Sequence, residues 1–160
     1  MLELYYHPLA SFCHKVLIPL YESGTPFEAI IVDLMDADER ASFYDLWPVG
    51  KMPVLRDRSR NEVVPETSII IEFLDRHYPG PSPMLPADQD LCLRVRLWDR
   101  FFDLYVHEPL QKIVLDKIRP EDARDPAGVD DARRRLSTAY GMIDRQVADK
   151  TWITGQDFTL

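Results

Sequence analysis

The sequence predicts an α/β domain followed by an all-α domain. Up to His77, short alternating or apolar segments typical of strands occur between segments with helical periodicity. The proline-dense residues 79–83 then interrupt this pattern and cannot be helical. From Asp88 onward, apolar residues recur at helical spacing. We therefore predict an α/β domain at 1–78, a linker at 79–88 and a helical domain at 89–160.

The first half of the α/β domain is predicted to be strand, helix, strand. Leu2–Tyr6 alternates and is aromatic, which favours a strand. Ser11 is a good N-cap for a helix over residues 12–23, although Pro19 should kink that helix. Residues 27–34 form the second strand, whose apolar centre indicates burial on both faces. A right-handed crossover makes the two strands parallel neighbours.

The second half is predicted to be helix, two strands, helix. A short helix should follow Asp36, because Asp36 and Glu39 resemble a capping box. The strands 52–57 and 61–64 surround a polar turn, and so short a connection makes them an antiparallel hairpin. Thr67–His77 is the last helix, with its apolar side chains inward. Its mostly outward positions are Glu72, Asp75 and Arg76.

Two long helices are expected in the second domain. The first should kink or break near Val106 and His107, because Pro109 lies inside its pattern, and the pattern resumes at 111–118. The second runs over 126–148, since Pro126 suits a first helical turn. Its predicted apolar face consists of Leu136, Tyr140, Ile143 and Val147.

Composition argues against several kinds of partner. The 160 residues carry a net charge of -8, which disfavours nucleic acid or an anionic membrane. No apolar run is long enough for a bilayer, and no signal peptide is visible. Cys13 and Cys92 are scattered, as in a reduced cytoplasmic protein. The histidines lack metal-ligand spacing and the glycines form no phosphate loop, so we predict no metal and no nucleotide.

Pro53 stands at the start of a short apolar run. Proline has no backbone N–H and therefore suits the beginning or edge of a strand. A trans proline that opens a strand is one interpretation. The other is a cis Met52–Pro53 bond, because X-Pro is the only peptide bond for which cis is accessible at low cost. A cis bond would turn the Met52 backbone outward, where it could pair with an extended peptide ligand.

The run Pro-x-Gly-Lys-x-Pro-Val-Leu at 48–55, followed by Glu66, Thr67 and an Ile-rich helix, resembles the glutathione-binding half of a cytosolic glutathione S-transferase. The resemblance extends over residues 5–160 and implies a thioredoxin-like first domain. Relative to the family, about the last quarter of the chain is absent, so we expect an incomplete helical domain. In the family, the residue before a cis proline pairs with the cysteinyl backbone of glutathione, and the Glu-Thr pair holds its γ-glutamyl group. The resemblance thus implies these roles for Met52, Pro53, Glu66 and Thr67, and glycyl or nearby backbone contacts for Lys51.

Ser11 is the first candidate for the chemistry. Unpaired N–H groups at a helix N-terminus favour an anion such as a thiolate, and the Ser11 hydroxyl could hydrogen-bond the glutathione sulfur. A plain helix cap is the alternative role. The resemblance weakens the assignment, because serine-type members place this serine at the position of Ala10. Tyr5 and Tyr6 are alternatives that match the tyrosine-type members.

Cys13 is the second candidate. In a first helical turn its pKa should fall if the sulfur points toward solvent, and it could then form a mixed disulfide with glutathione. The alternative is a small buried apolar residue. No Cys-x-x-Cys partner is present, so a two-cysteine exchange is not expected.

Three functions follow as hypotheses. The first is a glutathione transferase that conjugates the glutathione thiolate to a small apolar electrophile and serves detoxification. The resemblance places Phe101 and Tyr105 in its electrophile pocket, although this aromatic stripe could also be core. The second is glutathione-dependent thiol–disulfide exchange through Cys13. The third is a non-catalytic interaction module on the same fold. The resemblance also implies a homodimer, formed through Thr67–His77 and the long helix after the linker.

Overall fold

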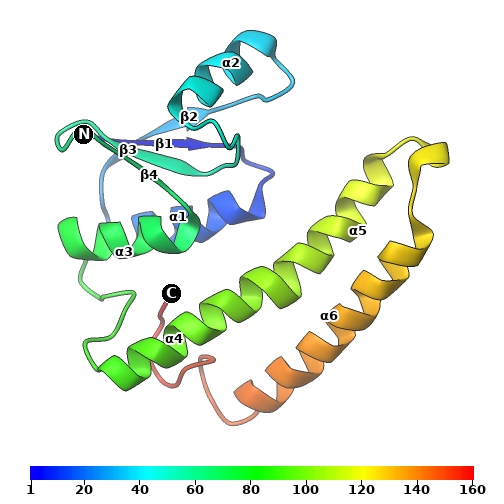
Figure 1. Cartoon of the computed structure of the whole chain (residues 1–160). Helices are drawn as coiled ribbons and strands as arrows, with labels where there is room; N and C mark the ends of the chain where they lie inside the picture. The colour runs from blue at the N-terminus through cyan, green and yellow to red at the C-terminus, as the bar shows by residue number, and fades with distance from the viewer. The chain divides into compact units, whose positions relative to one another are not determined.

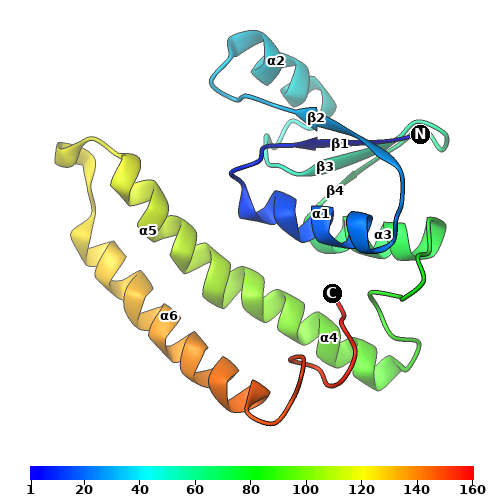
Figure 2. The same ribbon diagram turned by 180° about the vertical axis from the view of Figure 1, so that it is seen from behind.

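The computed structural model describes all of residues 1–160, as two compact units, Met1–Leu85 and Pro86–Leu160. Each unit is described by itself below. Figures 1 and 2 show the strands gathered in the first unit and long helices in the second. None of the helices combines the length and the apolar composition needed to cross a bilayer.

The first unit is a four-stranded mixed sheet with helices on both faces. The strand order is β2-β1-β3-β4, with β1 parallel to β2 and β3 antiparallel to both β1 and β4. This confirms the predicted parallel pair and the predicted hairpin. The elements are β1 Leu2–Tyr6, α1 Ser11–Glu22, β2 Phe27–Ile31, α2 Ala37–Leu46, β3 Val54–Asp57, β4 Glu62–Pro65 and α3 Thr67–His77.

Side-chain alternation gives the sheet two different faces. α1 and α3 cover one face, and α2 lies on the other (Figures 1 and 2). Leu4, Leu55 and Val64 are register partners on one face and are buried. Each such side chain contributes about 1.5–3 kcal/mol by leaving water. On the opposite face, Val32 and Val54 pack with Phe43 of α2 in a smaller cluster.

The second strand differs from the prediction. β2 ends at Ile31 and forms an edge of the sheet, whereas burial on both faces was expected. Ile31 is 57% exposed. An edge strand has a neighbour on one side only, so an apolar run there is not evidence for a central position.

Helix capping also differs from the prediction at the N-termini of α1 and α2. Ser11 is the first residue of α1 and Ala10 is its N-cap, without a side-chain hydrogen bond. The expected capping box of α2 is half formed: the Asp36 carboxylate accepts from the backbone N–H groups of Asp38 and Glu39, each at 2.9 Å. The Glu39 carboxylate instead accepts from the Asp33 N–H at 2.7 Å. Pro19 lies inside α1, which continues through it to Glu22.

Asp75 was expected on the outward face of α3, but it has a structural partner. Its two carboxylate oxygens accept from the backbone N–H groups of Met84 and Leu85, at 2.9 and 2.8 Å. Met84 is buried. The carboxylate therefore fastens the end of the proline-rich segment to α3.

The second unit is helical. Pro109 does not break the first long helix, because the chain passes through a π-helical turn immediately before it, which accommodates the missing N–H. α5 and α6 lie side by side (Figures 1 and 2). On α6 the buried stripe is Val129, Ala132, Leu136 and Ala139, whereas Tyr140, predicted to face inward, is 47% exposed. The elements are α4 Gln89–Phe101, η1 Phe102–His107, α5 Glu108–Ile118, η2 Glu121–Ala123 and α6 Pro126–Val147.

The turn between α5 and α6 is held by two carboxylates. Asp116 accepts from the backbone N–H of Asp125 at 2.9 Å. Asp125 caps α6 by accepting from the Gly128 N–H at 2.9 Å, and it accepts from Lys112 Nζ at 2.6 Å. The hydrogen bond from Lys112, followed by that from Gly128, lowers the pKa of Asp125.

Candidate glutathione site

Three chain segments leave the first unit's sheet at the same edge. β1 ends at Tyr6, β3 begins at Val54 and β4 ends at Pro65. The register pairs Tyr5 with Val54 and Val54 with Pro65, so these strand ends are neighbours. The segments beyond them carry Ser11, Met52–Pro53 and Glu66–Thr67, which we call the convergent edge. Residues far apart in sequence are thus brought to one side of the sheet.

Two helices begin at the convergent edge. α1 follows β1 and α3 follows β4, and neither helix has an acidic residue in its first turn. The first N–H groups of a helix lack intrahelical partners and carry partial positive charge. The hydroxyl of Ser68 on α3 accepts from Lys15 Nζ on α1 at 3.4 Å, which links the two helix starts. This arrangement suits a ligand with anionic groups.

The Met52–Pro53 peptide bond is cis. Met52 and Pro53 precede β3, whose paired residues begin at Val54. Of the two interpretations of Pro53, the structure has the one implied by the resemblance. Lys51, the next residue toward the N-terminus, is exposed.

Gly50 adopts a backbone conformation that the sequence motif did not predict. Its φ is +69°, a conformation that side-chain-bearing residues rarely adopt. A Cβ at this position would lie 2.5 Å from the Tyr44 ring. The turn from α2 to Lys51 is therefore built for glycine, and Gly50 helps to place the residues before β3.

Glu66 and Thr67 form the turn from β4 into α3. Glu66 has a φ of +69°, unusual for a residue with a side chain, and its side chain is exposed. Its carbonyl accepts from the Ile70 N–H at 2.8 Å, so it occupies the cap position of α3. Such backbone outliers concentrate at ligand sites. No sequence signal could have revealed this conformation, since glycine and asparagine are the usual markers.

Ser11 and Cys13 have opposite surroundings. Ser11 is exposed in the first turn of α1. Cys13 is 0% exposed, and burial raises the pKa of its thiol, although a backbone hydrogen bond with His7 partly offsets this. Of the two roles considered for Cys13, the structure therefore agrees with the small buried apolar side chain and not with a solvent-facing thiolate.

The two tyrosines of β1 differ in their surroundings. The Tyr5 hydroxyl donates to the buried carboxylate of Glu3 at 3.3 Å, and its ring packs 6.5 Å from the Phe43 ring, centroid to centroid. Tyr5 thus lies on the α2 side of the sheet. Tyr6 is half-buried at the end of β1.

Phe101 and Tyr105 belong to the second unit. Phe101 is buried at the end of α4, and Tyr105 is 51% exposed in η1. Their ring centroids are 5.2 Å apart. They form one aromatic cluster with Trp98 and Phe102. Phe101 is thus largely core, while Tyr105 retains surface for a ligand.

Comparison with known proteins agrees with this arrangement. Residues 4–82 match the family model of the glutathione S-transferase N-terminal domain. The chain belongs to the glutathione S-transferase family. Its fold is thioredoxin-like in the first unit and helical in the second, as in the family's solved structures.

Individual relatives are distant but cover nearly the whole chain. Glutathione S-transferase GstB of Escherichia coli is 23% identical over 146 residues, which are 90% of this chain and 70% of that protein. A stringent starvation protein A homolog of Coxiella burnetii is 28% identical over 160 residues, 100% of this chain and 70% of its own. A glutathione S-transferase of Methylobacterium radiotolerans, solved with glutathione sulfonate, is 28% identical with a TM-score of 0.81, covering 99% of this chain and 72% of that one.

Proposed function

We propose that this chain is a glutathione transferase that binds glutathione at the convergent edge. The observation that carries the proposal is the meeting of two helix N-termini with the Met52–Pro53 segment at one sheet edge. In this proposal Met52 pairs with the cysteinyl backbone, Glu66 and Thr67 hold the γ-glutamyl group, and Lys51 faces the glycyl carboxylate. The solved relative that carries glutathione sulfonate supports the ligand class.

The Ser11 hydroxyl is proposed to stabilise the glutathione thiolate. A free thiol has a pKa near 8.5, and lowering it by two units requires about 2.7 kcal/mol. A hydrogen bond to a charged group contributes about 1.5–3 kcal/mol and a helix N-terminus about 0.3–1 kcal/mol. Together these two effects are large enough. The thiolate then forms a C–S bond with a small apolar electrophile, whose leaving group departs with the bonding electron pair.

Replacement of Ser11 tests this assignment. Ser11→Ala should leave glutathione affinity within about threefold but raise the pKa of the bound thiol by at least one unit, because the donor to the sulfur is lost. Thiolate absorbance in the near ultraviolet, titrated with pH, measures the pKa, and calorimetry measures binding separately. Ser137→Ala, on the exposed face of α6, is the matched control. An unchanged thiol pKa in Ser11→Ala would remove Ser11 from the mechanism.

A non-catalytic interaction module is the second candidate. It is favoured by the similarity to a stringent starvation protein A homolog, whose name does not describe a transferase, and by the serine at position 11 rather than 10. This function predicts a folded protein with no measurable affinity for glutathione. Saturable glutathione binding together with a lowered thiol pKa would exclude it. The remaining hypothesis, thiol–disulfide exchange through Cys13, is disfavoured by the burial of that thiol.

A further inference from the structure

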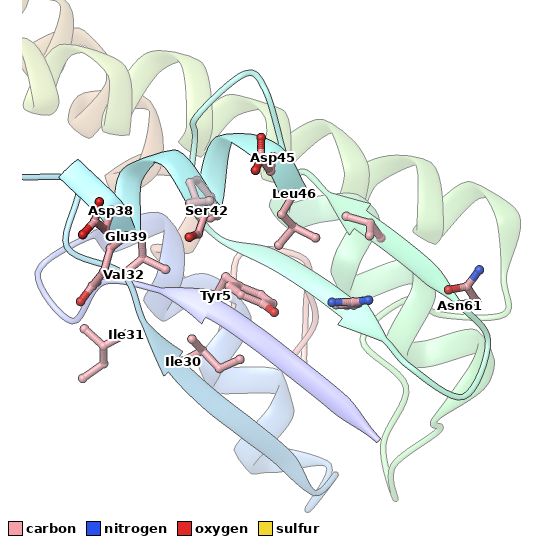
Figure 3. Close-up of a pocket in the computed structure, with 13 residues that line it drawn as sticks. Tyr5, Ile30, Ile31, Val32, Asp38, Glu39, Ser42, Asp45, Leu46 and Asn61 are labelled. Atoms are coloured by element: carbon pink, nitrogen blue, oxygen red, sulfur yellow. The ribbon is translucent and has the colours of Figure 1, made fainter. Parts of the chain in front are cut away.

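A hollow lies between α2 and the sheet, on the face opposite α1 and α3 (Figure 3). Its volume is about 720 Å³, within the range of small-molecule sites. None of the residues of the convergent edge lines it. It is therefore separate from the proposed glutathione site, and the proposed function leaves it unused.

The floor of the hollow is apolar and aromatic. The register places Ile30 beside Tyr5, and Arg56 beside Val63, on the same face of the sheet. α2 packs its Phe43 over one end of this face, in the cluster with Val32 and Val54, and leaves the rest uncovered. An apolar ligand body would bury surface against these side chains.

The α2 side of the hollow is acidic. Asp38, Ser42 and Asp45 recur at i, i+4 and i+7 and so share one face of α2 (Figure 3). The side chains of Asp38 and Asp45 have no hydrogen bond or ion pair within the chain. Glu39 adds a third carboxylate to the lining. Nothing within the chain neutralises the two aspartates.

The basic group of the lining, the Arg56 guanidinium, belongs to the sheet side of the hollow. Arg56 lies on β3, beside Val63 of β4 and opposite the buried Glu3 of β1. Glu3 is itself paired with Arg58. Arg56 has no ion pair within the chain. Charge is thus separated across the hollow, with the carboxylates on α2 and the guanidinium on the sheet.

We propose that this hollow binds an organic cation, a protonated or quaternary amine carried on an apolar, aromatic body. The ammonium group lies along α2 between Asp38 and Asp45, which are two helical turns apart, where the field of both carboxylates attracts it. The apolar body rests on Ile30 and Val63. Arg56 repels the cation and so orients it toward α2.

Three probes that share one apolar body and differ in charge test whether the hollow selects a cation. The probes are 4-phenylbutylamine, 4-phenylbutyrate and 4-phenylbutanol, followed by amide shifts in NMR spectra of the full chain at low ionic strength. We expect saturable shifts at Ser42, Tyr5 and Val63 with the amine, and about tenfold weaker binding of the carboxylate, with the alcohol between them. Added salt should weaken the amine alone.

Variants that change the charge of the lining should change the affinity for the amine in opposite directions. Asp38→Asn combined with Asp45→Asn should weaken the amine about fivefold, whereas Arg56→Gln should strengthen it about twofold. Ser42→Phe should block the hollow by volume. Asp144→Asn, an exposed carboxylate on α6, is the control and should change nothing. Circular dichroism checks that each variant is folded.

Several results would overturn the proposal. Equal affinity for all three probes, or no saturable shift with the amine, would show that the hollow does not select a cation. Unchanged amine binding in the Asp38/Asp45 double variant would do the same. Shifts with a lysine-rich peptide but not with the amine would assign the hollow to protein docking instead.

Discussion

Asp57 holds the turn between β3 and β4 through one buried carboxylate. It accepts from the Ser59 N–H at 2.9 Å, the Ser59 hydroxyl at 2.6 Å and the Arg60 N–H at 3.3 Å. Its second oxygen accepts from the Tyr78 hydroxyl, just after α3. Burial opposes ionisation, but these hydrogen bonds outweigh it and lower the pKa of Asp57. The hydrogen bond to Asp57 also raises the pKa of Tyr78.

This network predicts a pH-dependent contribution to stability. Asp57→Asn should lower the free energy of unfolding at pH 7 by about 1–3 kcal/mol, because the charged acceptor is lost. Since the folded-state pKa is lowered, the contribution is present above the unfolded value near 3.9 and disappears as pH falls through the folded value. The difference between variant and parent should therefore shrink below about pH 4. Urea unfolding at pH 7 and pH 3 measures it; a constant difference would contradict the assignment.

At the scale of elements, α2 connects the two proposed ligand sites of the first unit. Its polar face borders the hollow, and the turn after it, through Gly50, leads to Lys51 and Met52. Its start depends on Asp36, which accepts two backbone N–H groups. The helix has a single fully buried side chain, Phe43, so its ends matter for its stability.

Removing the cap should therefore affect both sites. Asp36→Ala should cost about 1 kcal/mol of stability, whereas Asp36→Ser, which can still cap, should cost less. We expect faster amide hydrogen exchange in α2 with the alanine variant and weaker binding of the amine probe. Equal exchange rates in the alanine and serine variants would show that the cap does not limit this helix.

At the scale of the whole molecule, we propose a cytoplasmic homodimer that detoxifies small electrophiles, with α3 and α4 as the interface elements. α4 exposes Leu93 and Leu97, and Arg94 and Arg100 are exposed on the same helix. On α3, Asp75 already accepts hydrogen bonds from the backbone of Met84 and Leu85 within its own chain.

The oligomeric state can be measured directly. At micromolar concentration, sedimentation should give twice the 18.6 kDa chain mass. Leu97→Glu should shift the population toward monomer, because it places a charge in an apolar contact. Glu121→Gln, exposed in η2, is the control. A monomer in the parent protein at this concentration would contradict the dimer.

Local patterns determined the element order and the hairpin, whereas the resemblance carried by residues 48–55, Glu66 and Thr67 indicated the family and the residues of the convergent edge. Alternation, helical periodicity and proline placement act over a few residues, so they are readable without tertiary structure. Thr67–His77 was predicted with its observed bounds for this reason. Only the tertiary structure decided that β2 is an edge strand, that Cys13 is buried and that Asp75 binds the segment after α3. These depend on which distant segments lie nearby, and the same holds for the positive φ of Glu66 and for the hollow beneath α2.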